Sequence, residues 1–157
     1  MDATTMPSTH SILNKLKQDF PNLTFQPADD FWWSAANKTV YIDSLADNSQ
    51  ILTLHELSHA LLNHTNYERD VELLQLERDA WEYARTVLSN KYDIPIDNET
   101  IQNHLDTYRH WIYARSSCPQ CSTNGVQKKE RIYTCISCNH NWRVNEARVC
   151  ALRRYAQ

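Results

Sequence analysis

The hydrophobic and polar positions of the first part of the chain follow two different periods. Over residues 8–20, apolar side chains recur at helical spacing after a Ser/Thr capping signal, and Pro21 stops the pattern. These apolar positions are Ile12, Leu13, Leu16 and Phe20. Residues 31–34 and 39–43 are instead rich in aromatic and β-branched side chains and flank a turn at 35–38. We therefore expect an amphipathic helix followed by a β-hairpin.

Helical periodicity returns in the centre of the chain. Residues 49–64 are apolar on most sides, which is typical of a helix buried in the middle of a domain. A further helix is expected over residues 68–90, where apolar side chains gather on one face. The next one, capped by Asp97 or Asn98, is expected to run to about Arg115.

Composition and charge exclude several classes of protein. The 157 residues are 41% hydrophobic and 22% charged, with a formal net charge of -3 at pH 7, which does not suit a disordered chain or a bulk polyanion binder. The N-terminus has neither the basic nor the apolar region of a signal peptide, and no stretch is apolar enough to cross a bilayer. The single glycine, Gly125, leaves no glycine-rich phosphate loop. We expect a cytoplasmic protein without a membrane partner.

A zinc-binding pattern, His55-Glu56-Leu57-Ser58-His59, lies within the expected buried helix. Two histidines four positions apart project from the same face of a helix, so both can bind one zinc ion through an imidazole nitrogen. Glu56 lies beside them and can accept the proton of a water molecule that attacks a carbonyl. We expect His55 and His59 to be zinc ligands and Glu56 to be the catalytic general base.

The best third ligand is Glu77, on the helix expected over residues 68–90. At roughly 100° per residue, Glu77 falls on the apolar face of that helix. Three other acidic residues fall away from that face; they are Glu72, Asp79 and Glu82. This face comprises Leu73, Ala80, Ala84 and Leu88. A carboxylate on a buried face needs a charged partner, and a zinc ion provides one. The alternative is an ordinary surface glutamate on an imperfect apolar stripe.

His64 is a further histidine close to the zinc-binding pattern. It follows His55 by nine positions and His59 by five, which places it well round the helix from both. We therefore interpret His64 as a residue of the helix C-terminus, whose imidazole complements the helix dipole, and give less weight to the alternative of a substrate-side group.

Two runs of the sequence, from His55 to His64 and from Leu76 to Ala84, resemble the ImmA/IrrE family of metallopeptidase-like proteins. The family pattern is His-Glu-Leu-Gly-His-Ala-Leu-Leu-Gly-His, followed later by Glu-x-Glu-Ala-x-x-Phe-Ala. The resemblance covers about residues 37–88.

The resemblance implies a mainly helical, gluzincin-like α+β domain with a small β-hairpin or sheet, zinc on His55, His59 and Glu77, and cleavage of a regulatory protein such as a repressor. Ser58 replaces the usual glycine and Asp79 replaces the second glutamate. Neither is an expected ligand, so the metal site is expected to survive while the substrate stays open. The SprT-like family, which joins a similar site to a cysteine ribbon and acts on proteins at DNA, fits the Glu77 helix less well.

Four cysteines near the C-terminus form two Cys-x-x-Cys pairs, Cys118 with Cys121 and Cys135 with Cys138, separated by thirteen residues. This spacing is typical of a tetrahedral four-thiolate zinc site. Such a site has no open coordination position, so we expect a structural zinc that supplies the folding free energy of a small module. The fifth cysteine, Cys150, is expected to be a buried or spare thiol.

The cysteine module resembles zinc ribbons of the transcription-factor type over residues 133–143. Asn124-Gly125 is expected to be the hairpin turn, and residues 131–134 the returning strand. Ser122 and Asn139 stand where ribbons often have glycine.

Basic residues make the module locally positive, and Tyr133 and Trp142 are interleaved with them. The basic residues are Lys128, Lys129, Arg131, Arg143, Arg148, Arg153 and Arg154. This combination suits contacts with nucleic-acid phosphates and stacking on bases. The alternative is a solvated face on a module that docks a protein.

Taken together, the patterns predict an α+β fold with a metallopeptidase-like domain over residues 1–115 and a zinc ribbon over residues 116–157. The leading hypothesis is a zinc metallopeptidase, with one catalytic and one structural zinc, that hydrolyses a peptide bond in a partner protein such as a transcriptional regulator. One alternative is a non-catalytic zinc protein whose ribbon binds nucleic acid or a protein. Another is a DNA-associated protease of the SprT-like kind.

Overall fold

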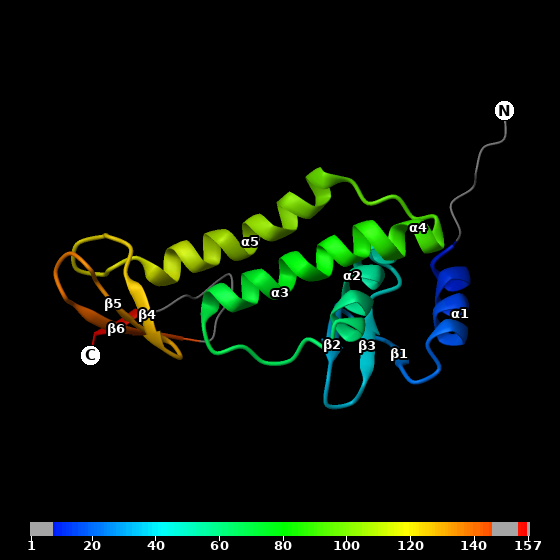
Figure 1. Ribbon diagram of the computed structural model, residues 1–157, viewed down its shortest axis with the longest axis horizontal. Helices are drawn as coiled ribbons and strands as arrows, with labels where there is room; N and C mark the ends of the chain where they lie inside the picture. The colour runs from blue at the N-terminus through cyan, green and yellow to red at the C-terminus, as the bar shows by residue number, and fades with distance from the viewer. Residues whose placement is uncertain (1–7, 146–153, 157) are drawn as a thin grey trace. The chain divides into compact units, whose positions relative to one another are not determined.

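The computed structural model describes residues 8–145 and the backbone of residues 154–156 (Figure 1). The predictions for Cys150, Arg148 and Arg153 therefore lie outside the described residues. The architecture is α+β, as the sequence predicts.

The contacts within the chain divide it into two compact units. The first comprises residues 1–65 and 78–98, and the second comprises residues 66–77 and 99–157. The sequence instead predicts two domains, over residues 1–115 and 116–157. That division stays a prediction.

The first unit begins with helix α1, Thr9–Asp19. Ser8 caps it, because the backbone N–H of Ser11 donates to the Ser8 hydroxyl oxygen at 3.2 Å. Ile12 and Leu16 are fully buried on its inner face. The helix predicted over residues 8–20 is thus confirmed.

A small sheet follows, with strands β1 (Thr24–Pro27), β2 (Trp32–Ser34) and β3 (Thr39–Ile42) in the order β1-β3-β2. Strands β2 and β3 pair antiparallel, which confirms the predicted hairpin. Strand β1 pairs parallel with β3 and was not predicted.

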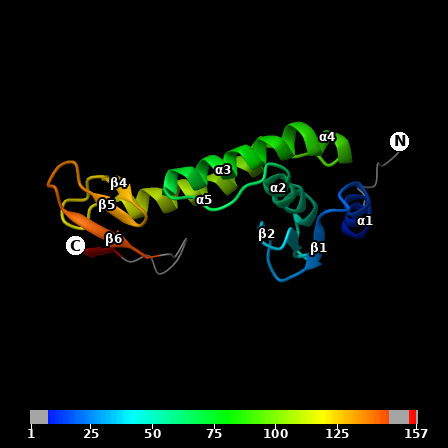
Figure 2. The same cartoon turned by 60° about the horizontal axis from the view of Figure 1, so that its bottom comes forward.

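Helix α2, Ser49–Leu61, packs against β2, β3 and α1, as Figures 1 and 2 show. Val40 and Ile42 of β3 and Leu54 and Leu57 of α2 are buried. The helix is buried along most of its length, as its apolar sequence predicts. It therefore forms the centre of the first unit.

The helix predicted over residues 68–90 is a helical run in three parts. Helix α3 spans Asp70–Tyr83, a π-helical turn η1 spans Ala84–Leu88, and α4 spans Ser89–Tyr92. The π turn was not predicted. It packs against α2 within the first unit.

The second unit contains the start of α3, helix α5 (Asn98–Ser116) and a four-stranded antiparallel sheet in the order β4-β5-β6-β7. The strands are β4 (Val126–Lys129), β5 (Ile132–Thr134), β6 (Asn141–Val144) and β7 (Arg154–Ala156). The expected helix to about Arg115 and the returning strand within residues 131–134 are both present.

The predicted hairpin turn at Asn124-Gly125 is wrong, because β4 begins only at Val126 and turns back at Glu130-Arg131. Arg131 there adopts a left-handed φ of 59°. Gly125 serves another purpose: a Cβ on it would lie 2.5 Å from the Trp142 ring and 2.6 Å from the Thr134 carbonyl oxygen. Its lack of a side chain lets the backbone pass close to the ribbon's core.

Within the residues that the structure describes, no helix combines the length and the apolar character needed to cross a bilayer.

Candidate metal centres

Helix α2 places His55, Glu56 and His59 together in the first unit. Both histidines are buried on the inner side of the helix, and the Glu56 side chain is 14% exposed. The neighbouring Ser58 is buried as well, and its hydroxyl donates to the Leu54 carbonyl of the same helix at 2.8 Å. The serine that replaces the usual glycine of the resembled family is therefore accommodated within α2.

The two histidines face each other at a distance that suits a shared metal ion. The Nε2 atoms of His55 and His59 lie 3.2 Å apart. Two bonds of about 2.05 Å at a tetrahedral angle place two nitrogens about 3.3 Å apart, so the spacing fits zinc. Glu56 Oε1 lies 3.9 Å from His55 Nε2, and ligand atoms of all three residues lie within 4.8 Å of one another. The group can hold a metal ion.

An aromatic ring that the sequence reading missed holds His55 in place. Trp81 of α3 is 1% exposed, and its ring stacks on the His55 imidazole with 4.1 Å between centroids and 17° between planes. Trp81 lies one turn after Glu77 on the inward face of α3. Its position along the helix could therefore have predicted, from the sequence, that its ring is buried.

Glu77 is buried, with an exposed fraction of 6%, whereas Glu72 and Glu82 are exposed. The predicted inward phase of Glu77 is confirmed, and the alternative of a surface glutamate is wrong. Glu77 is not one of the three closely grouped ligand residues, which are those of α2. Its role as a ligand remains a prediction.

The position predicted for His64 is wrong. The chain leaves the helical path at Asn63, which has a φ of 55°, so helical phase does not extend to His64. His64 Nδ1 lies 2.8 Å from His59 Nδ1. His64 therefore contacts the nitrogen of His59 that points away from His55.

The four cysteines of the ribbon form the second candidate centre. Their ligand atoms all lie within 4.8 Å of one another, with Sγ distances of 3.7 Å from Cys118 to Cys138 and 3.5 Å from Cys121 to Cys135. These distances are too long for disulfide bonds. Two zinc–sulfur bonds of about 2.3 Å at a tetrahedral angle place the sulfurs about 3.8 Å apart. The cluster can thus hold a metal ion.

Backbone N–H groups point at the sulfurs, as the knuckle prediction requires. Those of Gln120, Ser137 and Cys138 approach Cys118 or Cys135 Sγ at 3.3 to 3.4 Å. These bonds stabilise thiolates, which is the form that binds a metal.

The thiol pKa values differ across the cluster. Hydrogen bonds from the Thr123 side chain and backbone and from Cys135 lower the pKa of Cys121 to about 6. A backbone hydrogen bond at His140 lowers the pKa of Cys138, but burial and the three neighbouring thiols outweigh it and raise that pKa to about 12. Without a cation, four adjacent thiolates are mutually unfavourable.

The residue after each Cys-x-x-Cys pair has a left-handed backbone conformation. These are the two positions at which zinc ribbons often have glycine. Ser122 has a φ of 63° and Asn139 a φ of 60°. Asparagine tolerates this conformation better than serine does.

A buried ion pair joins the ribbon to two helices of the second unit. Asp70, in the first turn of α3, is 3% exposed, and Arg115, near the end of α5, is 2% exposed. The Arg115 Nε donates to Asp70 Oδ2 at 2.7 Å, and the Tyr133 hydroxyl of β5 donates to the same oxygen at 2.5 Å. The indole N–H of Trp142 donates to the Arg115 carbonyl at 2.9 Å. The sheet is thus held directly to both helices.

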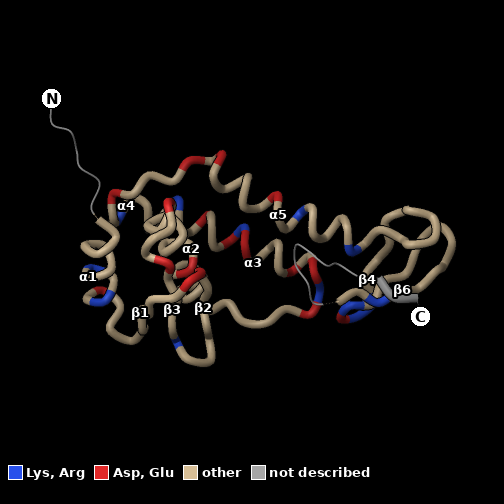
Figure 3. The backbone as a smooth tube through the Cα atoms, turned by 180° about the vertical axis from the view of Figure 1, so that it is seen from behind, with Lys and Arg blue, Asp and Glu red and all other residues tan. Residues whose placement is uncertain are grey.

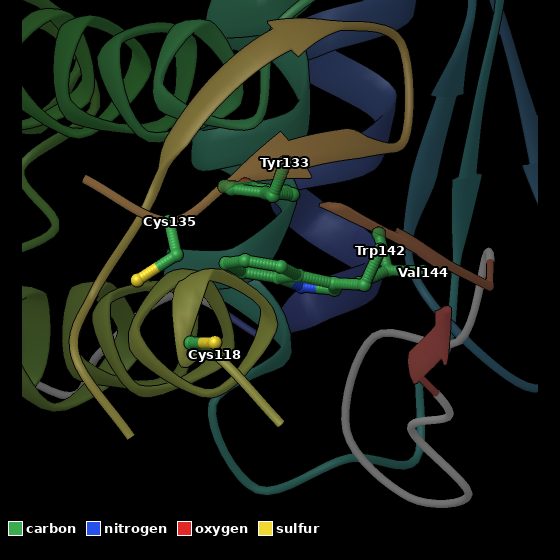
Figure 4. Packing of buried hydrophobic residues seen from close by; sticks show 5 residues of the cluster. All are labelled: Cys118, Tyr133, Cys135, Trp142 and Val144. Atoms are coloured by element: carbon green, nitrogen blue, oxygen red, sulfur yellow. The ribbon is translucent and has the colours of Figure 1, made fainter. Parts of the chain in front are cut away.

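Tyr133 and Trp142 cannot stack on bases, contrary to the sequence interpretation. They are 3% and 0% exposed and form the ribbon's core with Val144, Cys118 and Cys135, as Figure 4 shows. Burial and the Asp70 carboxylate also raise the pKa of Tyr133 well above its usual range. The alternation of polar and apolar positions along β5 and β6 was the signal for this burial.

The basic side chains of the ribbon are on its surface. Lys128, Lys129 and Arg143 are exposed and Arg131 is partly exposed, and Figure 3 shows the blue segment at β4. Residues 126–144 contain one acidic residue, Glu130, whose Oε1 lies 3.9 Å from Arg131 Nε.

No family model, curated protein or solved structure matches the chain.

Proposed function

We propose that the chain is a zinc-dependent metallopeptidase, with its catalytic site on α2 and a structural zinc in the ribbon. The observation that carries the proposal is the 3.2 Å separation of the His55 and His59 Nε2 atoms. The Glu56 carboxylate stands beside this pair, 3.9 Å from His55 Nε2. Two imidazoles and a carboxylate in this arrangement suit metal-assisted hydrolysis.

Each residue has a distinct role in this reaction. Zinc held there would supply a Lewis acid that polarises the substrate carbonyl and activates water. Glu56, which keeps some solvent exposure, accepts the proton of the attacking water and delivers it to the leaving amine. We assign the buried Glu77 as the third ligand, because the resemblance to the ImmA/IrrE family implies a glutamate ligand at this position of the motif.

The resemblance to the ImmA/IrrE family suggests the substrate class, which is a regulatory protein such as a transcriptional repressor. The first run of the family motif begins on α2 and continues to His64, and the second lies on α3 and reaches Ala84 at the start of η1. We therefore expect a folded or partly folded protein as the substrate.

Metal analysis tests the two sites. Purified wild-type protein is expected to hold two zinc ions per chain, and Glu77→Ala and Cys118→Ser are each expected to lose one. Glu82→Ala is the matched control, because Glu82 is an exposed glutamate on the same helix. Retention of both ions by Glu77→Ala would refute the ligand assignment.

Cleavage is tested with a mixture of proteome-derived proteins and peptides, in which new N-termini are identified by mass spectrometry. The zinc-loaded wild type is expected to produce a defined set of new termini. Glu56→Gln is expected to bind zinc normally and to abolish that set, because glutamine cannot accept the proton. An unchanged set of termini with Glu56→Gln would contradict the proposal.

The exposed basic residues of the ribbon favour one second candidate, a zinc protein that acts at nucleic acid. Labelled DNA is expected to bind with an affinity that falls steeply as salt rises, and a Lys128→Gln/Lys129→Gln variant is expected to bind more weakly. If cleavage by the wild type required DNA, the SprT-like alternative would be favoured. If no termini appeared with or without DNA while DNA binding persisted, the non-catalytic alternative would be favoured.

A further inference from the structure

His64 lies beyond the end of α2 and returns to its last turn. The backbone N–H of Asn63 donates to the Ala60 carbonyl at 3.1 Å, and that of His64 donates to the His59 carbonyl at 2.9 Å. With the left-handed Asn63, these two bonds form a Schellman motif, which brings the residue after the left-handed position against the last helical turn. Two hydrophobic side chains frequently meet at this point. In this chain two histidines meet there.

The two imidazoles are in hydrogen-bonding contact. The Nδ1 atoms of His59 and His64 lie 2.8 Å apart, and the ring planes meet at 66°. One nitrogen of this pair must donate and the other must accept. The other ring nitrogen of His59, Nε2, lies 3.2 Å from His55 Nε2. Each nitrogen of the His59 ring therefore contacts another histidine.

The metal role of His59 decides the direction of this hydrogen bond. A neutral imidazole that binds a metal through Nε2 must carry its proton on Nδ1. His59 Nδ1–H is then the donor, and His64 Nδ1 is the acceptor. If His64 donated instead, His59 would carry its proton on Nε2 and could not be a ligand.

The structure holds His64 in place from its other side. The indole N–H of Trp33, on strand β2, donates to the His64 backbone carbonyl at 3.1 Å. The same residue is therefore fixed by the hairpin through its carbonyl and by α2 through its N–H. A fixed acceptor limits the rotation of the His59 ring.

We propose that His64 is a positioning residue, which accepts the Nδ1 proton of His59 and thereby selects the tautomer and ring orientation in which His59 Nε2 binds the metal. The inference rests on the proposed function only in taking the α2 group as a metal site. It does not require the metal site to be catalytic.

The test compares His64→Leu, which has no acceptor, with His64→Asn, whose side-chain carbonyl oxygen can replace Nδ1. Zinc affinity is measured by competition with a chelator, and cobalt(II) is used as a spectroscopic probe. The ribbon site is recognised by its intense sulfur-to-cobalt charge-transfer band, and the α2 site by weaker ligand-field bands. His10→Leu is the matched control, since His10 is an exposed histidine on α1.

His64→Leu is expected to weaken metal binding at the α2 site about 10–100-fold and to shift its ligand-field bands, with the ribbon site unchanged. His64→Asn is expected to restore most of the affinity. Wild-type affinity and spectrum in His64→Leu would overturn the inference, and so would loss of binding in both variants with unchanged circular dichroism. If instead the wild type bound no metal at the α2 site, the proposed function itself would fail.

Discussion

Removal of Asp70 is expected to destabilise the second unit strongly. Asp70 and Arg115 are almost fully buried, and Arg115 Nε lies 2.7 Å from Asp70 Oδ2. Asp70→Ala would leave the guanidinium buried without its counter-charge. Arg115 would keep a bond to the Asn145 carbonyl and its position over the Trp111 ring, at 4.4 Å from the ring centroid, but neither supplies a negative charge.

The expected loss is about 3–5 kcal/mol in the free energy of unfolding, which is the usual cost of breaking a buried ion pair from one side. Tyr133→Phe removes only one hydrogen bond to the same carboxylate, and is expected to cost about 1.5–3 kcal/mol. Because both changes act on one oxygen atom, the double variant is expected to cost less than the sum of the two.

The matched control is Asp106→Ala on α5. Asp106 also pairs with an arginine, because its Oδ1 lies 2.9 Å from Arg109 Nη1, but its side chain is 50% exposed. An exposed pair contributes about 0–1 kcal/mol. Urea unfolding is followed by circular dichroism at a fixed zinc concentration, because bound metal shifts the apparent stability. If Asp70→Ala cost no more than Asp106→Ala, the buried pair would not hold this unit together.

Three further outcomes are expected. Burial and the hydrogen bond to Asp19 raise the pKa of Tyr92 from 10.0 to about 12, so the folded state keeps this proton longer than the unfolded state. Its contribution to stability is full below pH 10 and is lost as the pH rises through about 12. Thermal melts recorded over this pH range are expected to show a smaller fall in melting temperature for Tyr92→Phe than for the wild type. Ser122→Gly is expected to raise the unfolding free energy by about 1 kcal/mol, measured by zinc-saturated urea unfolding, and a decrease would contradict the strain assigned to its left-handed backbone. Gly125→Ala is expected to weaken cobalt binding at the four cysteines, because the new Cβ meets the Trp142 ring, and unchanged affinity would contradict that crowding.

Much of the fold could be predicted from local patterns. The helix after Ser8 and the hairpin of β2 and β3 depend on neighbouring residues, which a sequence displays directly. Strand β1 was missed because it is short, ends at Pro27 and pairs in parallel with a strand that follows a hairpin turn. The π turn at Ala84–Leu88 was missed because an apolar face does not show which carbonyl each N–H binds.

The site residues, too, could be predicted where they depend on local helical periodicity and not where they depend on other features of the fold. His55, His59 and the inward phase of Glu77 follow from positions along continuous helices. His64 does not, because one left-handed residue, Asn63, ends the helical phase. The basic residues around Tyr133 and Trp142 left base stacking open as one alternative, whereas the alternation of buried and exposed positions along β5 and β6 places both rings in the core.

The first turn of helix α3 is a point at which the C-terminal sheet is held to the helices of the second unit. Asp70 and Glu77 lie seven positions apart, which is about two turns, so they occupy the same face of the helix, and both are buried. Asp70 accepts hydrogen bonds from Arg115 and from Tyr133 of the ribbon sheet. A helix held in this way at its first turn cannot rotate freely within the second unit, so these bonds fix the buried face that carries Asp70 and Glu77 against α5 and the sheet.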